Sequence, residues 1–236
     1  MKTLQDKNPV ILGTNDLLIG LCNSVSNVLG VTTKTRIQYS GMVQRIKKTC
    51  LKPDIGCFVL FDGGFSGLVI LNFSAQSAIE LYESYMLNMG MNKEDLVSSY
   101  TSDEVSNVMG ELMNQVLGDF TSKVRRELHT DITQNQPKML VINKQVMLSV
   151  DANLDQPEAR RVTFYTARNN IFYLELAVDR TEFIKLYDFE PQAVLDPDEL
   201  MDQAIAQQQN TASAAVMPVP SPGAGDTDDL LRSLGM

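Results

Sequence analysis

Glu111 and Asn114 are the residues of this sequence whose types and spacing could do chemistry. They lie three positions apart in GELMNQVLG, residues 110–118, a segment whose composition predicts a helix. Side chains three positions apart are neighbours on a helix surface. From one rigid surface, an Asn carboxamide can orient a water molecule, and a Glu carboxylate can bind a cation beside a reaction centre. The plainer interpretation is a solvated helix surface, on which Glu and Asn are common.

No other pattern in the chain points to a reaction. The segment GGFSG, residues 63–67, misses the spacing of a nucleophile elbow by one residue. No glycine-rich phosphate loop with its Lys occurs. His129 is the only histidine, and Cys22, Cys50 and Cys57 lack the spacing of metal ligands, so we expect no metal site. We expect the cysteines to be buried, reduced thiols.

A helix over residues 102–128 must position the polar pair. Its start resembles a capping box, with Thr101 as N-cap and Glu104 three residues later. Apolar residues follow at helical spacing and form one stripe, which we expect to face the core. Glycine inside a helix costs about 1 kcal/mol of helix stability relative to alanine. We interpret Gly118 as a position without a side chain at which a partner approaches the helix closely. The positions opposite the stripe are Asn107, Glu111, Asn114 and Gly118.

The elements before residue 100 form one half of a predicted duplication. A helix over residues 14–30 ends at Gly30, and a strand follows in residues 34–48. Two β-rich runs around residues 62–64 predict a hairpin. Ser74 then caps a second helix.

The second half repeats this order. The long helix is followed by the strand-like segment 138–150, a hairpin that turns at residues 169–170 and a short helix capped by Asp179. We therefore predict an α+β fold. In it, two pseudo-duplicated helix–strands–helix halves share one antiparallel-rich sheet, with the long helices packed on one face.

Composition bounds the classes of partner and the compartment. The chain has 236 residues, 44% of them hydrophobic, and a net charge of −9, which disfavours nucleic acid as a partner. No run of apolar residues is long enough to span a membrane, so we expect no membrane insertion. The N-terminus lacks the apolar run of a signal peptide. A cytoplasmic protein is expected.

The end of the chain differs from its body. From residue 191 onward the acidic residues far outnumber the basic ones, and an Ala-, Pro- and Ser-rich segment predicts a flexible linker. The last residues, DTDDLLRSLGM, form a dense apolar cluster among acidic residues. We divide the chain into a folded domain at residues 1–190, a linker at 191–225 and a C-terminal motif at 226–236.

The polar pair resembles a known motif once Pro137 is included. The CheC/CheX/FliY family of response-regulator phosphatases carries the pattern (Asp/Ser)-x3-Glu-x2-Asn-x22-Pro. Glu111 and Asn114 fit this pattern, and Pro137 follows after twenty-two residues. The Asp/Ser position is Asn107 here. The resemblance covers roughly residues 10–190 and implies the CheX/CheC fold.

Some members of this family carry a second copy of the motif on the first helix. In this chain Asn23 is preceded by Gly20 instead of Glu, and Ile46 stands where the motif has Pro. The resemblance therefore implies a single site, as in CheX-like members.

The chain's end is similar to another chemotaxis sequence. Its last residues resemble the C-terminal peptide with which the unrelated phosphatase CheZ docks on the response regulator CheY, with Met236 in place of a terminal aromatic residue. The resemblance implies that the tail tethers the same partner, with its leucines as anchors. The matching residues are Asp228, Asp229, Leu230, Leu231, Ser233, Leu234 and Gly235.

The resemblance implies an enzyme that dephosphorylates the aspartyl phosphate of a CheY-like response regulator. Asn114 would orient the hydrolytic water, and Glu111 would pair with the receiver's Lys. Asn107 and Gly118 would contact the receiver. The chain would need no cofactor of its own, because the receiver's active site supplies Mg²⁺.

Two further expectations concern partners. Relatives of the family also serve as flagellar-switch components, so a non-catalytic receiver-binding module or scaffold is the alternative to an enzyme. An unpaired edge of the shared sheet would also allow a homodimer.

Overall fold

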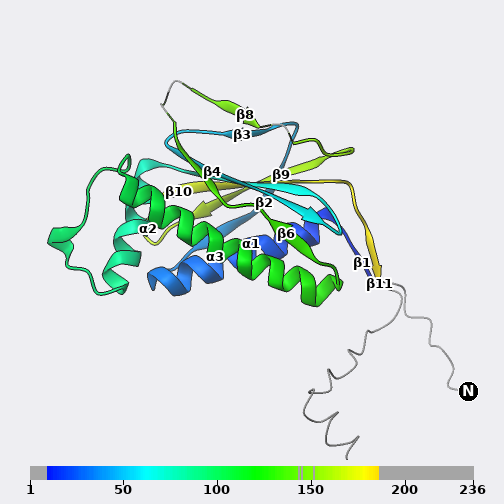
Figure 1. The fold of residues 1–236 in the computed structure, drawn as a ribbon, viewed down its shortest axis with the longest axis horizontal. Coiled ribbons are helices and arrows are strands. Elements are labelled where there is room, and N and C mark those ends of the chain that lie inside the picture. The colour runs from blue at the N-terminus through cyan, green and yellow to red at the C-terminus, as the bar shows by residue number, and fades with distance from the viewer. Residues whose placement is uncertain (1–9, 143, 145, 151, 186–236) are drawn as a thin grey trace, which may run out of the picture. The chain divides into compact units, whose positions relative to one another are not determined.

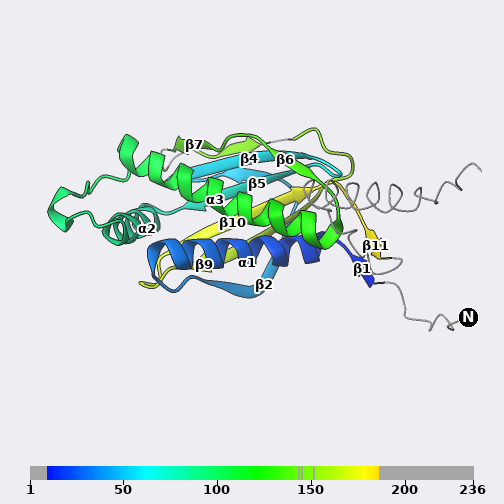
Figure 2. The same ribbon diagram turned by 60° about the horizontal axis from the view of Figure 1, so that its bottom comes forward.

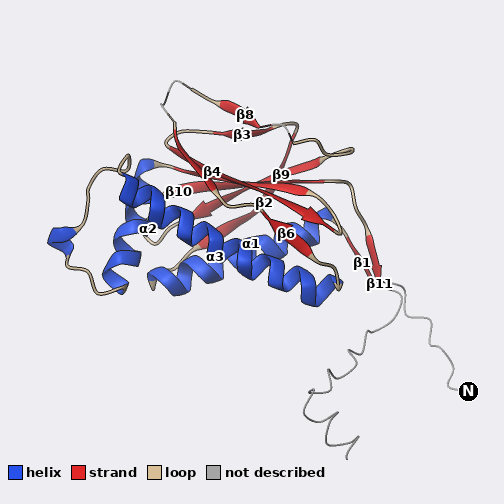
Figure 3. Ribbon diagram, in the orientation of Figure 1, coloured by secondary structure: helices blue, strands red, loops and turns tan. Residues whose placement is uncertain are grey.

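The computed structural model describes residues 10–185 except 143, 145 and 151. These residues form one large antiparallel sheet with three helices on one face and smaller strand pairs beside it (Figures 1 and 3). The predicted α+β class is confirmed. No helix in the described part of the chain has the length and apolar character needed to cross a membrane.

The three helices form where the sequence predicts them. Helix α1 spans Thr14–Thr33, α2 spans Ala75–Asn88, and α3 spans Asp103–Leu128, while a short 3-10 turn, η1, covers Lys93–Asp95. Helices α1 and α3 lie next to each other on the sheet (Figure 2). Each buries its apolar stripe in the main core, because a stripe at helical spacing can be removed from water only against another layer.

The main sheet interleaves strands from the two halves. Its order is β2 (Gln38–Ile46), β9 (Glu158–Tyr165), β10 (Ile171–Val178), β5 (Gly67–Phe73), β4 (Ile55–Gly63) and β6 (Ile132–Gln134), with β7 (Lys138–Val141) also paired to β4. Every pairing in it is antiparallel. The two hairpins meet at β10 and β5, and β2 and β7 each lie beside the hairpin of the other half. Each half thus contributes one strand to the hairpin of the other half, an arrangement that supports the predicted duplication.

Two small sheets complete the described fold. Strand β3 (Thr49–Leu51) pairs with β8 (Leu148–Val150) over the face that the helices leave free, where a second apolar cluster lies. Strand β1 (Val10–Leu12) pairs with β11 (Phe183–Lys185).

The core beneath the helices is rich in aromatic rings. The rings of Phe73 and Phe164 stack on opposite sides of Phe172, with centroid distances of 5.1 and 5.0 Å. This row crosses β5, β10 and β9, and so joins strands of both halves. Such contacts add to the burial of the rings themselves.

The predicted helix after Asp179 is wrong, because residues 183–185 form strand β11 instead. The carboxylate of Asp179 accepts a hydrogen bond from the backbone of Asp155 and so does not cap a helix. Pairing with β1 satisfies the backbone of this segment, and Phe183 packs its ring against Phe65. Within the described residues, α2 therefore has no counterpart in the second half.

Two predicted helix ends are also wrong. The N-cap of α3 is Ser102, whose hydroxyl accepts from the Val105 backbone, and not Thr101. The carboxylate of Glu104 accepts a hydrogen bond from the hydroxyl of Tyr82 instead of closing a capping box. Helix α1 continues through Gly30 to Thr33, and its C-cap residue Lys34 adopts the left-handed conformation.

Candidate functional site

Helix α3 presents its polar residues as predicted, on the side away from the core. Val105, Met109, Leu112, Val116 and Phe120 are buried against the sheet and α1. Asn107 and Glu111 are exposed, and Asn114 and Gly118 are half-buried. The pair therefore lies on a rigid surface that packing holds in place.

A depression of about 410 Å³ lies between α3 and the segment that leads into β7. Pro137 lines this depression together with Glu111 and Asn114, although it lies twenty-three positions after Asn114 in the chain. The lining residues are Ser106, Asn107, Gly110, Glu111, Asn114, Gln136, Pro137, Lys138 and Met139.

The route of the chain explains this meeting. Helix α3 ends at Leu128, and its C-cap residue His129 adopts the left-handed conformation, which turns the chain back. Strand β6 then pairs with the end of β4, and β7 pairs with the start of β4, so the connection with Pro137 passes beside α3. Met139 is half-buried and packs against the core, and it comes close to the backbone of Gly110.

The two polar side chains have different neighbours. The carboxylate of Glu111 accepts a hydrogen bond of 2.9 Å from Nε2 of Gln115, one turn along the helix. Within the described part of the chain, the carboxamide of Asn114 has no hydrogen-bond partner, and it lines the depression. The chain thus orients the carboxylate and leaves the amide free to hold a water molecule.

Gly118 lies outside the depression. Apart from the adjacent backbone of its own helix, no atom lies within 4 Å of the place where its Cβ would be, so the surface beside it is open. Its carbonyl accepts hydrogen bonds from the hydroxyls of Thr121 and Ser122. The lining residues Ser106, Gly110, Gln136, Lys138 and Met139 were not predicted. Their nearness in sequence to Asn107 or Pro137 was the only signal for them.

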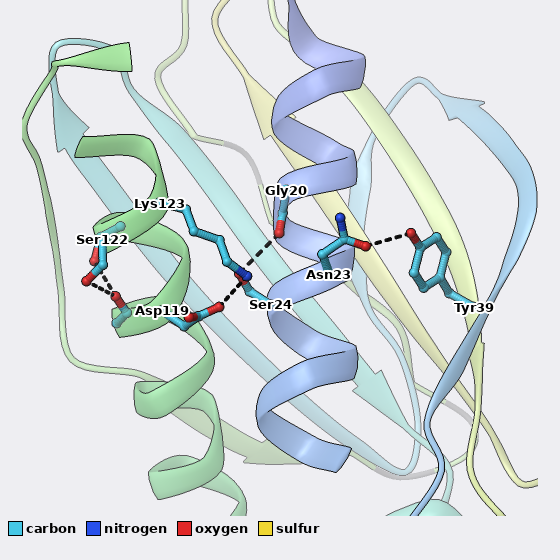
Figure 4. Close-up of polar contacts among 9 residues, drawn as sticks. Gly20, Asn23, Ser24, Tyr39, Asp119, Ser122 and Lys123 are labelled. Carbon is cyan, nitrogen blue, oxygen red and sulfur yellow. Dashed lines mark hydrogen bonds and ion pairs between the residues drawn. The ribbon is translucent and has the colours of Figure 1, made fainter. Parts of the chain in front are cut away.

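The corresponding position on α1 is organised differently (Figure 4). Oδ1 of Asn23 accepts a hydrogen bond of 2.9 Å from the hydroxyl of Tyr39 on β2. Gly20, one turn earlier, supplies no carboxylate. These residues favour the prediction that the chain has one candidate site, on α3.

Polar contacts join α1 to α3 near this position. Nζ of Lys123 lies 2.6 Å from Oδ2 of Asp119 and donates to the buried Ser24 hydroxyl at 3.0 Å (Figure 4). The pKa of Asp119 lies below its usual value. Burial alone would raise this pKa, but the hydrogen bonds from Lys123 and Ser24 and the positive charges of Lys123 and Arg126 lower it by more.

The part of the chain that the structure describes contains no group of three His, Cys, Asp or Glu residues placed to hold a metal ion. Cys22 and Cys57 are buried free thiols, and burial raises the pKa of each to about 12. Cys50 is only half-buried, which differs from the prediction, because it lies on the small strand β3.

The predicted tail residues lie outside the described residues. This applies to the linker at 191–225 and to the motif at 226–236. The residues concerned are Asp228, Asp229, Leu230, Leu231, Leu234 and Met236.

Comparison with known proteins places this fold. A family model described as "Protein of unknown function (DUF3334)" matches residues 8–236. The chain belongs to the DUF3334 family. No curated protein matches this DUF3334 chain.

Solved structures show the same fold. A chemotaxis protein CheX from Desulfovibrio desulfuricans has a TM-score of 0.57 and 16% identity, over 70% of this chain and 99% of that one. A CheC-like superfamily protein from Shewanella sp. PV-4 has a TM-score of 0.57 and 17% identity, over 70% and 97% of the two chains. CheX from Vibrio vulnificus has a TM-score of 0.57 and 13% identity, over 70% and 99%. The DUF3334 chain therefore has the CheX/CheC fold, as its motif predicted.

Proposed function

We propose that this DUF3334 chain dephosphorylates the aspartyl phosphate of a CheY-type response regulator. The observation that supports this most is the depression that unites Glu111, Asn114 and Pro137. Their spacing is that of the CheC/CheX/FliY motif, and the fold that holds them is the fold of CheX and CheC-like chemotaxis proteins. Since response regulators are cytoplasmic, the proposal also places the chain in the cytoplasm.

Asn114 has the chemical role in this proposal. A phosphorylated receiver already holds the phosphoryl group, a Mg²⁺ ion and a Lys, which together stabilise the charge that develops in the transition state. It lacks a water molecule aligned for attack on phosphorus. The free carboxamide of Asn114 would hold that water in line, and a fixed position removes part of the entropic barrier.

Glu111 has a docking role. Its exposed carboxylate would pair with the receiver's Lys and so fix where α3 lies over the phosphoryl group. Gln115 already orients this carboxylate, which lowers the cost of ordering it on binding. Neither residue becomes covalently modified, and neither needs to change its protonation state.

Multiple turnover tests the proposal. Purified chain is mixed with an excess of phosphorylated CheY-type receiver from the same organism, with Mg²⁺ present, and phosphate release is followed over time. We expect each chain to release many equivalents of phosphate faster than the receiver does alone. Binding of the receiver without faster release would contradict the enzyme and favour a receiver-binding module.

A further inference from the structure

The small sheet of β3 and β8 covers part of the main sheet on the face that the helices leave free (Figure 1). A cavity of about 190 Å³ lies between this cover and the main sheet. Its lining comes from β3, β5, β8, β9 and β10 and from the segments that precede β3 and β9. The cavity shares no residue with the depression beside α3, so it is a second, separate space.

The floor of the cavity is formed by small side chains. Ala159 of β9 and Ala177 of β10 are direct partners, and Ala177 pairs on its other side with Leu68 of β5. Alanine is depleted in strands, because its single methyl group packs little surface against its neighbours. Val150 and Leu154 supply apolar walls. The interior is therefore apolar, and it is open where larger side chains would fill it.

Buried polar side chains hold the cover in place beside this floor. The carboxylate of Glu175, on β10 two residues before the floor alanine, accepts a hydrogen bond of 2.9 Å from the backbone of Cys50. The carboxamide of Asn72 accepts from the backbone of Lys52 at 2.7 Å and donates to the carbonyl of Cys50 at 2.9 Å. Both side chains are buried, so breaking these contacts is costly. The cavity is thus a preformed part of the fold, as most ligand sites are.

Positive charge lies at the rim of the cavity. Lys47 and Lys48, in the turn between β2 and β3, are exposed lining residues, and Ser149 adds a hydroxyl. Among the described residues, neither lysine forms an ion pair, and no acidic residue lines the cavity. The carboxylate of Glu158, at the start of β9, is already paired with Arg160 at 2.8 Å. In a chain with a net charge of −9, this arrangement favours an anion.

We propose that this cavity binds a small organic acid, with its apolar body on the alanine floor and its carboxylate between Lys47 and Lys48. An apolar cavity of about 150 Å³ can hold benzene, so 190 Å³ suits an apolar body of one ring. Lysine ammonium groups donate strong, charge-assisted hydrogen bonds to a carboxylate. The proposal does not depend on the phosphatase activity, since binding is measured without a receiver.

Three probes separate the apolar and the charged parts of the site. The full chain, with isotope-labelled alanine methyl groups, is titrated with benzoate, benzyl alcohol and acetate, and the methyl NMR signals of Ala159 and Ala177 are followed. Benzoate has a ring and a carboxylate, benzyl alcohol has the ring without the charge, and acetate has the charge without the ring. Ala78, which is buried in the core beneath the helices, is the internal reference.

We expect benzoate to shift both signals saturably, with a dissociation constant of about 1 mM or lower, as a ligand of this size allows. Benzyl alcohol should bind about tenfold more weakly, because it lacks the charge. Acetate should shift neither signal, because it buries almost no apolar surface. No shift with benzoate, or equal affinity for benzoate and benzyl alcohol, would overturn the proposal.

Variants at the rim test the role of the lysines. Lys47→Ala with Lys48→Ala should raise the dissociation constant for benzoate about tenfold and leave that for benzyl alcohol unchanged. The control is Arg36→Ala with Lys93→Ala, which removes two positive charges at exposed positions that do not line the cavity. A rim variant that binds benzoate as tightly as this control contradicts the proposal.

Filling the floor tests the location. Ala177→Val adds two methyl groups at a buried position and should abolish the benzoate-dependent shift of the Ala159 signal. Circular dichroism checks that this variant folds, and the rim variant decides the proposal if it does not. A folded Ala177→Val chain that binds benzoate like the wild type would place the ligand elsewhere and overturn the assignment.

Discussion

Asn114 and Glu111 share one helix surface but have different surroundings. The amide has no partner among the described residues, whereas the carboxylate is held by Gln115. This difference matches the division of roles between a side chain that orients water and one that docks. It also makes the two roles separable by kinetics.

For Glu111→Ala we expect slower phosphate release at low receiver concentration and a smaller decrease of the rate at saturating receiver. The lost pair with the receiver's Lys should raise the half-saturation concentration about two- to fivefold, and more if docking buries it. Steady-state titration with phosphorylated receiver measures this. Glu127→Ala, an exposed carboxylate further along α3, is the control and should behave as the wild type. Unchanged half-saturation with lost turnover would mean that the docking role is wrong.

At the residue scale, the sequence predicts the α3 surface but not the opposite wall. Helical period alone places Asn107, Glu111 and Asn114 on one side. Whether Met139 or another residue lies opposite depends on how β7 pairs with β4, and this pairing has no local signal. Gly118 shows the same limit, because its helix position was predictable and its distance from the depression was not.

Among the elements, α1 and α3 hold the site in place through both apolar and polar contacts. The polar contact consists of Asp119, Lys123 and Ser24 between the two helices. Because the pKa of Asp119 is lower in the folded chain than in the unfolded chain, its charged form stabilises the fold above about pH 4. That contribution is lost as the pH falls through the folded-state pKa.

Asp119→Asn should therefore lower the free energy of unfolding by about 0.5–1 kcal/mol at neutral pH. The difference from wild type should shrink as the solution is acidified below about pH 4, where the wild-type carboxylate becomes protonated as well. Urea unfolding at several pH values measures this. Asp131→Asn removes the more exposed pair with Arg125 and should cost little. Equal stability of Asp119→Asn and wild type at neutral pH would show that the contact does not stabilise the fold.

Elements with a strong period were predictable, and short ones were not. The apolar stripe of α3 and the two hairpins carry clear local signals, and the structure confirms them. The segment after Asp179 has a cap residue and helical spacing, yet it pairs with β1 far away in sequence. Tertiary pairing decides such short segments, because their intrinsic helix stability is small.

For the whole molecule, the exchange of strands between the two halves joins them into one sheet, so that both long helices pack on the same face. The shared sheet fixes α1 and α3 side by side, and only α3 carries the Glu and Asn of the motif. The duplication was predictable from the order of elements. The exchange of edge strands was not, because it is a property of long-range pairing.

The C-terminal motif gives a prediction for the whole chain. Deleting residues 226–236 should raise the half-saturation concentration for the phosphorylated receiver about tenfold to a hundredfold and spare the maximal rate. A tether holds the partner equally in the ground and transition states, so it does not change the chemistry. Leu230→Ala with Leu231→Ala should reproduce the deletion, and a scrambled order of the same residues is the control for length. A lower maximal rate at unchanged half-saturation would contradict a tether.

The central claim is that Asn114 orients the attacking water, and one comparison tests it most directly. Phosphate release from saturating phosphorylated receiver is measured for wild type, Asn114→Ala and Asn23→Ala. Asn23 is the matched control, since it holds the corresponding position on α1 and is engaged by Tyr39. We predict that Asn114→Ala loses at least about a hundredfold in maximal rate, with a stability change within about 0.5 kcal/mol, while Asn23→Ala keeps the wild-type rate. An Asn114→Ala variant that releases phosphate at the wild-type rate would contradict the account.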